Sequence, residues 1–216
     1  MCGRFFLDSD IGEIVEHYNA PPPDIYAARY NIAPTTPVLV RTDKALTLLR
    51  WGLVPSWSKD LSIGNRMFNA RAETVAEKPS FRQAYRRRRC LVAANGFYEW
   101  RTENGVKQPY CCHIDHQLFS MAGIWEQWQD AEGNHLQTCA IITTEAKGDM
   151  NNIHIRMPVY ISPENYQSWL DCRSEKTDIA DELVRQTNPQ YQYYAVSTAV
   201  NNSRHEGKDL IQPLGS

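Results

Sequence analysis

The 216-residue sequence has no apolar run close to the ~20 residues that a membrane-spanning helix needs. The chain start carries charges at Arg4, Asp8 and Asp10, and the apolar core region of a signal peptide does not follow. These absences predict a soluble cytoplasmic protein without a membrane partner. In that compartment the six cysteines should stay mostly reduced, so their even number does not predict disulfides.

An excess of positive charge is also missing, since 23 Lys and Arg face 25 Asp and Glu and the net charge is -2. Binding to nucleic acid would therefore have to rest on a local patch. Arginine outnumbers lysine, which favours forked contacts to phosphate and stacking on rings. The one dense basic run, Arg86 to Arg89, is interpreted as the solvated end of a helix.

The sequence contains no repeat, no low-complexity segment and no linker-like change of composition, which predicts one globular domain over residues 1–216. Periodicity and turn signals predict helices over 9–18, 79–89, 164–170 and 178–186. Strands are predicted over 37–40, 45–52, 90–101, 108–114, 118–128, 135–144, 157–162 and 191–197. Many short strands with few helices predict an α+β fold with a curved, mostly antiparallel sheet or open barrel, flanked by short helices.

Cys2 directly follows the initiator methionine, and its small size favours removal of Met1. The chain would then begin with a residue that carries both an α-amine and a thiol. An α-amine has a pKa near 7.7–8.0, so it can attack an aldehyde to give an imine, and the thiol can then close a five-membered thiazolidine ring. Gly3 permits close backbone approach, and Phe5 and Phe6 are expected to anchor the chain start.

Two further segments carry groups for proton transfer. In GFYEW (96–100), strand alternation places Glu99 on the same face as Phe97, which predicts a raised pKa and general acid or base work, unless an arginine pairs with it. In IHIRMP (153–158), His154 can move a proton near neutral pH, and Arg156, two residues on, can hold an anion. A solvated turn is the alternative interpretation of this second segment.

A loop-rich region supplies candidates for binding nucleic acid. Asn69 offers a donor and an acceptor, and Arg71 lies two residues on. Trp57 beside arginines suits the stacking of unpaired bases, whereas Trp51 is expected in the core. No metal or other cofactor is predicted. His113 and His116 lie near Cys111 and Cys112 in the sequence, but strand alternation sends adjacent residues to opposite faces, so the four side chains are not expected to converge on a metal ion.

Taken in order, these motifs resemble the SRAP family, the SOS-response-associated peptidase fold. The resemblance runs from residue 2 to about residue 213 and rests on MCGR, RYNIAPT (29–35), WGLVPSW (51–57), FNARAET (68–74), RCLVAANGFYEW (89–100), QPY (108–110), MAGIW (121–125), ITT (142–144), IHIRMPV (153–159) and VNN (200–202). The segment before Glu99 departs from the family pattern at Ala93 and Asn95, which predicts a changed turn.

The resemblance implies covalent capture of abasic sites in single-stranded DNA, through a thiazolidine at Cys2 after Met1 removal. It implies roles for Glu99 in sugar ring opening and crosslink reversal, for His154 at the imine, and for Asn69 at the sugar. Arg4, Arg71 and Arg156 match phosphate contacts, Trp57 matches a base contact, and Gly3 joins the DNA-binding set. It also implies autoproteolysis, lyase-type chemistry and, in a bacterium, association with the nucleoid; a monomer is expected.

Three other functions remain open at this stage. Cys2 could serve as the nucleophile of a glutamine amidotransferase, with its own amine as base. It could instead form a cysteine peptidase dyad with His154. A purely non-covalent module for single-stranded DNA would not need Cys2 at all.

Overall fold

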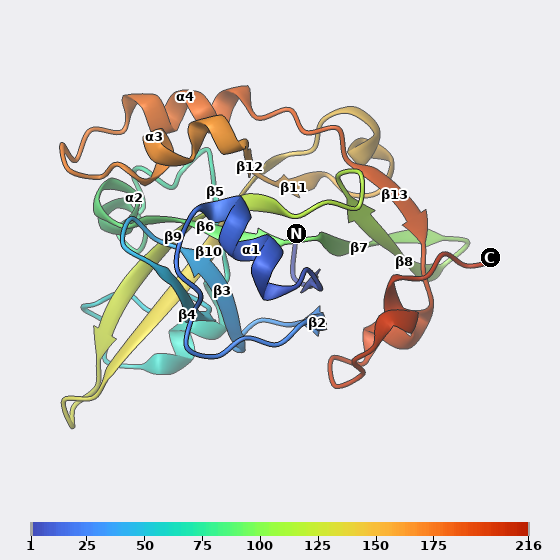
Figure 1. Cartoon of the computed structure of the whole chain (residues 1–216), viewed down its shortest axis with the longest axis horizontal. Coiled ribbons are helices and arrows are strands. Elements are labelled where there is room, and N and C mark those ends of the chain that lie inside the picture. The colour runs from blue at the N-terminus through green and yellow to red at the C-terminus, as the bar shows by residue number, and fades with distance from the viewer. Residues whose placement is uncertain (1, 216) are drawn as a thin grey trace.

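The computed structural model describes residues 2–215, which form two β-sheets with helices at their margins (Figure 1). The first sheet has five strands in the order β13-β8-β7-β1-β2, and all neighbours are antiparallel. Its strands are β1 (Phe5–Leu7), β2 (Arg29–Ile32), β7 (Gly96–Glu103), β8 (Val106–His113) and β13 (Gln192–Ala195).

The second sheet closes on itself into a barrel. Strand β10 pairs with β4 on one side and with β9 on the other, and β3 and β6 complete the ring. The ring strands are β3 (Pro37–Arg41), β4 (Leu46–Trp51), β6 (Arg89–Ala94), β9 (Phe119–Gln129) and β10 (His135–Glu145). Three short strands extend its rim: β5 (Asn69–Arg71), β11 (Arg156–Pro158) and β12 (Tyr160–Ile161). The predicted α+β class is confirmed.

Short helices flank the sheets. They are α1 (Ile11–Tyr18), α2 (Arg82–Arg87), α3 (Tyr166–Leu170) and α4 (Asp178–Gln186), with 3-10 turns η1 (Leu61–Arg66), η2 (Gly148–Asn152), η3 (Pro163–Asn165), η4 (Thr198–Asn201) and η5 (Lys208–Ile211). Figure 1 shows α3 and α4 side by side along the top of the molecule, and the β9–β10 hairpin projecting at the lower left. Within residues 2–215, every helix is too short or too polar to cross a membrane.

The predicted strand over 90–101 is wrong, because it is two strands in two sheets. Strand β6 belongs to the barrel and β7 to the first sheet, and the chain turns between them at Asn95. The Oδ1 atom of buried Asn95 accepts hydrogen bonds from the backbone N–H groups of Asp8 and Ser9, both at 3.0 Å. Contacts from a segment far away in the chain therefore fix this break.

The predicted strand over 157–162 is also wrong. Strand β11 pairs with β10, whereas β12 pairs with β9, and Val159 between them contacts both partners. Its N–H donates to Ile142 at 2.9 Å, and its carbonyl accepts from Ala122 at 2.7 Å. The predicted helix over 79–89 is shorter than expected because Arg89 already begins β6; Arg89 is buried, so the solvated helix end was the wrong interpretation for it.

The first sheet separates two apolar clusters. Phe5, Phe97 and Cys112 face the main core, which also fills the barrel, while Phe6 and Tyr98 face a smaller cluster under the C-terminal segment. The ring of Phe5 meets buried Trp51 edge-on at 5.1 Å, which confirms the core position of Trp51. The start of the chain is thus a strand of the first sheet, anchored by Phe5 in the main core and by Phe6 in the smaller cluster.

Candidate active site

Pairing of β1 with β7 sets the start of the chain beside Glu99. Phe5 lies opposite Phe97, and the N–H of Tyr98 donates to the carbonyl of Arg4 at 2.9 Å. Because the strands are antiparallel, the residues before Arg4 run alongside the residues after Tyr98. Cys2 and Gly3 therefore lie next to Glu99.

Cys2 is completely buried, so the chain is anchored at this residue and does not fray. Its carbonyl accepts a hydrogen bond from Nδ2 of Asn69 at 2.6 Å. Asn69 begins β5, which is held parallel to β10 with Asn69 opposite Ile141. The Oδ1 atom of the same amide is also buried, and it has no hydrogen-bond donor within residues 2–215.

Glu99 is a buried acid, as strand alternation predicted. It is 3% exposed, and burial raises its pKa to about 7. Burial also raises the pKa of the Cys2 thiol far above its ordinary value, and the Glu99 carboxylate adds to that increase. The site therefore holds a neutral thiol beside a carboxyl group that can both give and take a proton near neutral pH.

His154 lines a hollow of ≈600 Å³ on the surface. The walls of the hollow are formed by Arg71, Glu145, Ala146, Asn151, His154, Ile155 and Arg156. Strand β10 brings these segments together, because it pairs with β5 at Arg71 and with β11 at Arg156. Partial burial lowers the pKa of His154, so the neutral imidazole predominates at pH 7.

The three predicted phosphate contacts differ in exposure. Arg71 is exposed at the hollow. Arg4 is partly buried, and its Nη1 donates to Oδ1 of Asn31 at 2.7 Å and to the carbonyl of Val200 at 2.8 Å. Arg156 is 9% exposed and is held by Glu73. Arg71 is thus the most accessible cation of the three.

The remaining predicted DNA contacts, Trp57 and Gly3, also differ in exposure. The indole of Trp57, in the segment between β4 and η1, is 61% exposed and available for stacking. Gly3 is half-buried beside Cys2. Sequence reasoning missed Glu73, which pairs with Arg156, because an acidic residue in FNARAET carries no signal that distinguishes it from any surface acid.

The cysteines and histidines of β8 do not converge. Cys111 belongs to the smaller apolar cluster and Cys112 to the main core. The rings of His113 and His116 stack at 3.7 Å, and burial together with His116 lowers the pKa of His113 to about 4. No group of three or more His, Cys, Asp or Glu side chains among residues 2–215 is placed to hold a metal ion.

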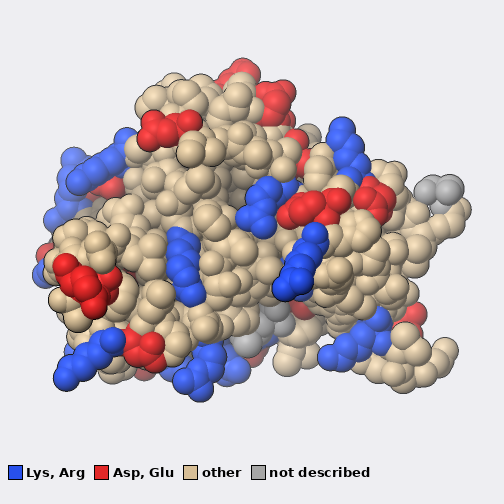
Figure 2. Space-filling model, turned by 90° about the horizontal axis from the view of Figure 1, so that it is seen from below, with Lys and Arg blue, Asp and Glu red and all other residues tan. Residues whose placement is uncertain are grey.

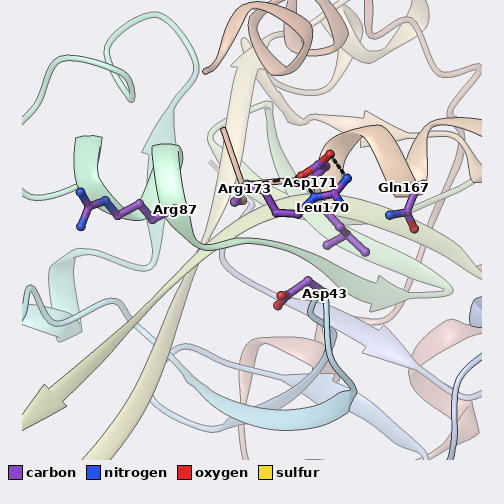
Figure 3. Close-up of a pocket in the computed structure, with 7 residues that line it drawn as sticks. Asp43, Arg87, Gln167, Leu170, Asp171 and Arg173 are labelled. Carbon is purple, nitrogen blue, oxygen red and sulfur yellow. Dashed lines mark hydrogen bonds and ion pairs between the residues drawn. The ribbon is translucent and has the colours of Figure 1, made fainter. Parts of the chain in front are cut away.

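A second cavity, of ≈380 Å³, holds none of the predicted site residues (Figure 3). It is lined by Asp43, Arg87, Gln167, Leu170, Asp171, Cys172 and Arg173. Its charges are largely satisfied within the chain, since Arg173 pairs with Asp171 at 2.7 Å and Arg87 with Glu175 at 3.1 Å. The hollow at His154 is therefore the better candidate for chemistry.

Charge on the surface is mixed. In the view of Figure 2, the described Lys and Arg side chains stand singly or in small groups, interleaved with Asp and Glu. This distribution agrees with the near-neutral net charge of -2. Contact with a polyanion would therefore be confined to a few residues.

Comparison with known proteins agrees with the motifs. The family model for the SOS response associated peptidase (SRAP) matches residues 1–203. A protein of Bacillus subtilis, abasic site processing protein YoqW, is 40% identical over 222 residues, which cover 98% of this chain and 99% of that protein. The rat abasic site processing protein HMCES is 31% identical, over 88% of this chain and 66% of its own length.

A solved structure from Bacteroides thetaiotaomicron has the same fold. It superimposes with a TM-score of 0.87 at 25% identity, over 98% of this chain and 99% of the other. Family model, relatives and structure all extend over nearly the whole chain. The chain belongs to the SOS response associated peptidase (SRAP) family.

Proposed function

We propose that this protein processes abasic sites in DNA by capturing them covalently in single strands, through Cys2 after removal of Met1. The observation that carries the proposal is the buried Cys2, held by Asn69 and placed beside Glu99. The names of relatives such as YoqW, an abasic site processing protein, support the same substrate.

The chemistry follows from the two nucleophiles of one residue. The α-amine of Cys2 adds to the aldehyde carbon of the ring-opened sugar, and loss of water gives an imine. The thiol sulfur then bonds to the same carbon, and its proton passes to the nitrogen, which yields a thiazolidine. Because both groups belong to one residue, the second step is intramolecular and gains the corresponding advantage in rate.

Glu99 is suited to the proton transfers. With a pKa of about 7, it is present in both forms at neutral pH, so it can protonate the sugar ring oxygen and later accept a proton. The same group would assist reversal of the crosslink and any lyase-type step. The buried Oδ1 of Asn69 can accept a hydrogen bond from a hydroxyl group of the sugar. His154 can transfer a proton to or from the imine.

The raised pKa of the Cys2 thiol favours this function over a thiol-first reaction. A cysteine peptidase or an amidotransferase needs a thiolate, and the environments that produce one lower the thiol pKa. A buried neutral thiol suits a reaction in which the amine attacks first. Autoproteolytic release of Met1 remains part of the proposal, and intact-mass measurement of the purified protein tests whether the release has occurred.

Variants of Cys2 separate the roles of nitrogen and sulfur. The processed protein is mixed with an oligonucleotide from which uracil has been excised, and products are resolved on a denaturing gel. Wild type should give a stable shifted band without reductant, and Cys2→Ala should give none. Cys2→Ala and Cys2→Ser both keep the α-amine but lack sulfur, so either variant should give a band only after borohydride reduction of the imine.

Cys172→Ala is the matched control, because Cys172 is the only described cysteine that is not fully buried. It should crosslink like wild type. A stable, unreduced band with Cys2→Ala would refute capture through Cys2. Loss of the band with Cys172→Ala would show that the reaction needs Cys172.

A further inference from the structure

Arg156 is a buried cation whose terminal nitrogens are engaged within the protein. Nη1 donates to Oε1 of Glu73 at 2.6 Å, and Nη2 donates to Oε2 of Glu73 at 3.0 Å and to the carbonyl of Thr143. A guanidinium that is 9% exposed needs such a counter-charge, because an unpaired charge is costly to bury. The forked geometry fixes its orientation.

The backbone of Arg156 in turn fixes His154. The amide N–H of Arg156 donates to Nδ1 of His154 at 2.9 Å. The carbonyl oxygen of Arg156 also lies 3.2 Å from Nδ1. The amide contact is the shorter of the two and its donor is fixed, so it selects Nδ1 as the acceptor and places the proton of the neutral imidazole on Nε2. The tautomer of His154 therefore depends on the position of the backbone at Arg156, the first residue of β11.

Glu73 comes from a different part of the chain. It follows β5, two residues after Arg71, and its side chain is 44% exposed. The hydrogen bond from Arg156 lowers the pKa of Glu73, so this carboxylate is ionised at neutral pH. The contact thus joins the segment that carries Asn69 to the segment that carries His154.

We infer that Glu73 is a positioning residue for His154: it clamps the Arg156 guanidinium, and Arg156 holds the imidazole in one orientation and one tautomer. The inference rests on the proposed function, in which His154 acts on the imine. It also assigns different roles to the two arginines of the hollow. Arg71, which is exposed, is left to contact phosphate, whereas Arg156 serves the geometry of the site.

The test compares Glu73→Gln with Glu145→Gln. Glu145 lines the same hollow and lies opposite Arg156 in the sheet, but Arg156 bonds to Glu73. Glu145 lines the hollow and Glu73 contacts Arg156 in its wall, so each variant removes one negative charge in or beside the hollow. Both should bind single-stranded DNA equally well or slightly tighter, measured with Cys2→Ala added to prevent crosslinking. Only Glu73→Gln should slow the capture step, by about 10-fold to 100-fold, as expected when a catalytic group is misplaced.

A second readout follows the tautomer directly. Nitrogen-15 spectra of the histidine ring, assigned to His154 with a His154→Gln variant, should show the Nε2–H form in wild type and in Glu145→Gln. Glu73→Gln should show a mixture of the two tautomers. If Glu73→Gln does not fold, Glu73→Asp, which keeps the charge on a shorter side chain, should give an intermediate mixture.

Two outcomes would overturn the inference. One is a Glu73→Gln protein with the tautomer and the capture rate of Glu145→Gln. The other is faster capture with much tighter binding in Glu73→Gln alone, which would make Glu73 a competitor of phosphate for Arg156. If wild type forms no crosslink at all, the proposed function fails, while the tautomer spectra still decide whether Glu73 positions His154.

Discussion

At the scale of single residues, Glu99 shows how burial creates a reactive group. An ordinary glutamate on a strand is ionised at neutral pH, but Glu99 is 3% exposed and keeps its proton up to a pKa of about 7. Ionised Glu99 in the folded protein lacks the hydration that it has in the unfolded chain. The protein therefore gives up stability at this residue in order to hold a proton donor beside Cys2.

This cost predicts a specific dependence of stability on pH. Between pH 4.5 and about 7 the folded state keeps the Glu99 proton while the unfolded state has lost it, so the free energy of unfolding falls as the pH rises. Glu99→Gln removes this titration. The variant should match wild type near pH 4 and exceed it at pH 8 by roughly 2–3 kcal/mol.

Urea unfolding at a series of pH values measures the difference between the two proteins. Comparing the two curves removes the contribution of all other titrating groups. Parallel curves for wild type and Glu99→Gln from pH 4 to pH 8 would show that the Glu99 pKa is not raised.

The environment of a candidate site residue could be predicted from the sequence only where its neighbours along the chain decide that environment. Strand alternation alone placed Glu99 on the face of Phe97, and the two phenylalanines after Arg4 predicted an anchored Cys2. The pairing of Glu73 with Arg156 joins residues 83 positions apart. No short-range pattern contains that information, since it depends on β10 bringing β5 and β11 together.

At the scale of elements, Arg89 links strand β6 to helices α2 and α3 through hydrogen bonds of its side chain. Its guanidinium donates to the carbonyls of Tyr85 at 2.8 Å, Trp169 at 2.6 Å and Asp171. These carbonyls belong to α2, α3 and the residue after α3, while Arg89 itself begins β6. One buried cation thereby ties both helices to the barrel.

Arg89→Met should destabilise the protein strongly. Methionine fills a similar volume but removes the donor from two buried carbonyl groups and one partly buried one. At about 1–3 kcal/mol for each buried group, a loss of at least about 2–3 kcal/mol is expected. Arg86→Met, at an exposed position of the same basic run, should change the free energy of unfolding by less than about 0.5 kcal/mol. Similar losses for the two variants in denaturant titrations would contradict the assigned contacts.

Prediction of the strands failed for an identifiable physical reason. All six residues of β6 are buried, so the alternation that marks a one-sided strand is absent, and the run continues into β7 without a visible boundary. Strands β1, β2 and β5, of three or four residues each, were not predicted. All three residues of β1 are buried, so β1 shows no alternation. The long strands of the β9–β10 hairpin were found within about one residue of their observed ends.

At the scale of the whole molecule, the near-neutral charge limits how DNA can be held. On the face shown in Figure 2 the cations are interleaved with acids, and of the three predicted phosphate contacts only Arg71 is exposed. We expect few phosphate contacts, about one to three, and hence a slope between about −0.7 and −2 for the logarithm of the binding constant against the logarithm of salt concentration. The small net charge of the protein also excludes strong long-range electrostatic attraction of a DNA strand.

Fluorescence anisotropy with an undamaged single-stranded oligonucleotide and Cys2→Ala measures this slope without covalent capture. Arg71→Gln should make it shallower by about 0.7, the share of one phosphate. A slope steeper than about −5 for the unsubstituted surface would contradict this expectation, because it would require about seven or more phosphate contacts.

The burial of five of the six cysteines changes what a labelling experiment would report. Iodoacetamide or a maleimide applied to the folded protein should modify Cys172 first, because Cys172 is partly exposed while the other five cysteines are buried. Cys2 should be among the last to be alkylated, although it is the proposed nucleophile. A screen that ranks cysteines by reactivity toward such probes would therefore select the wrong residue, and a small carbonyl compound would be the reagent that finds the right one.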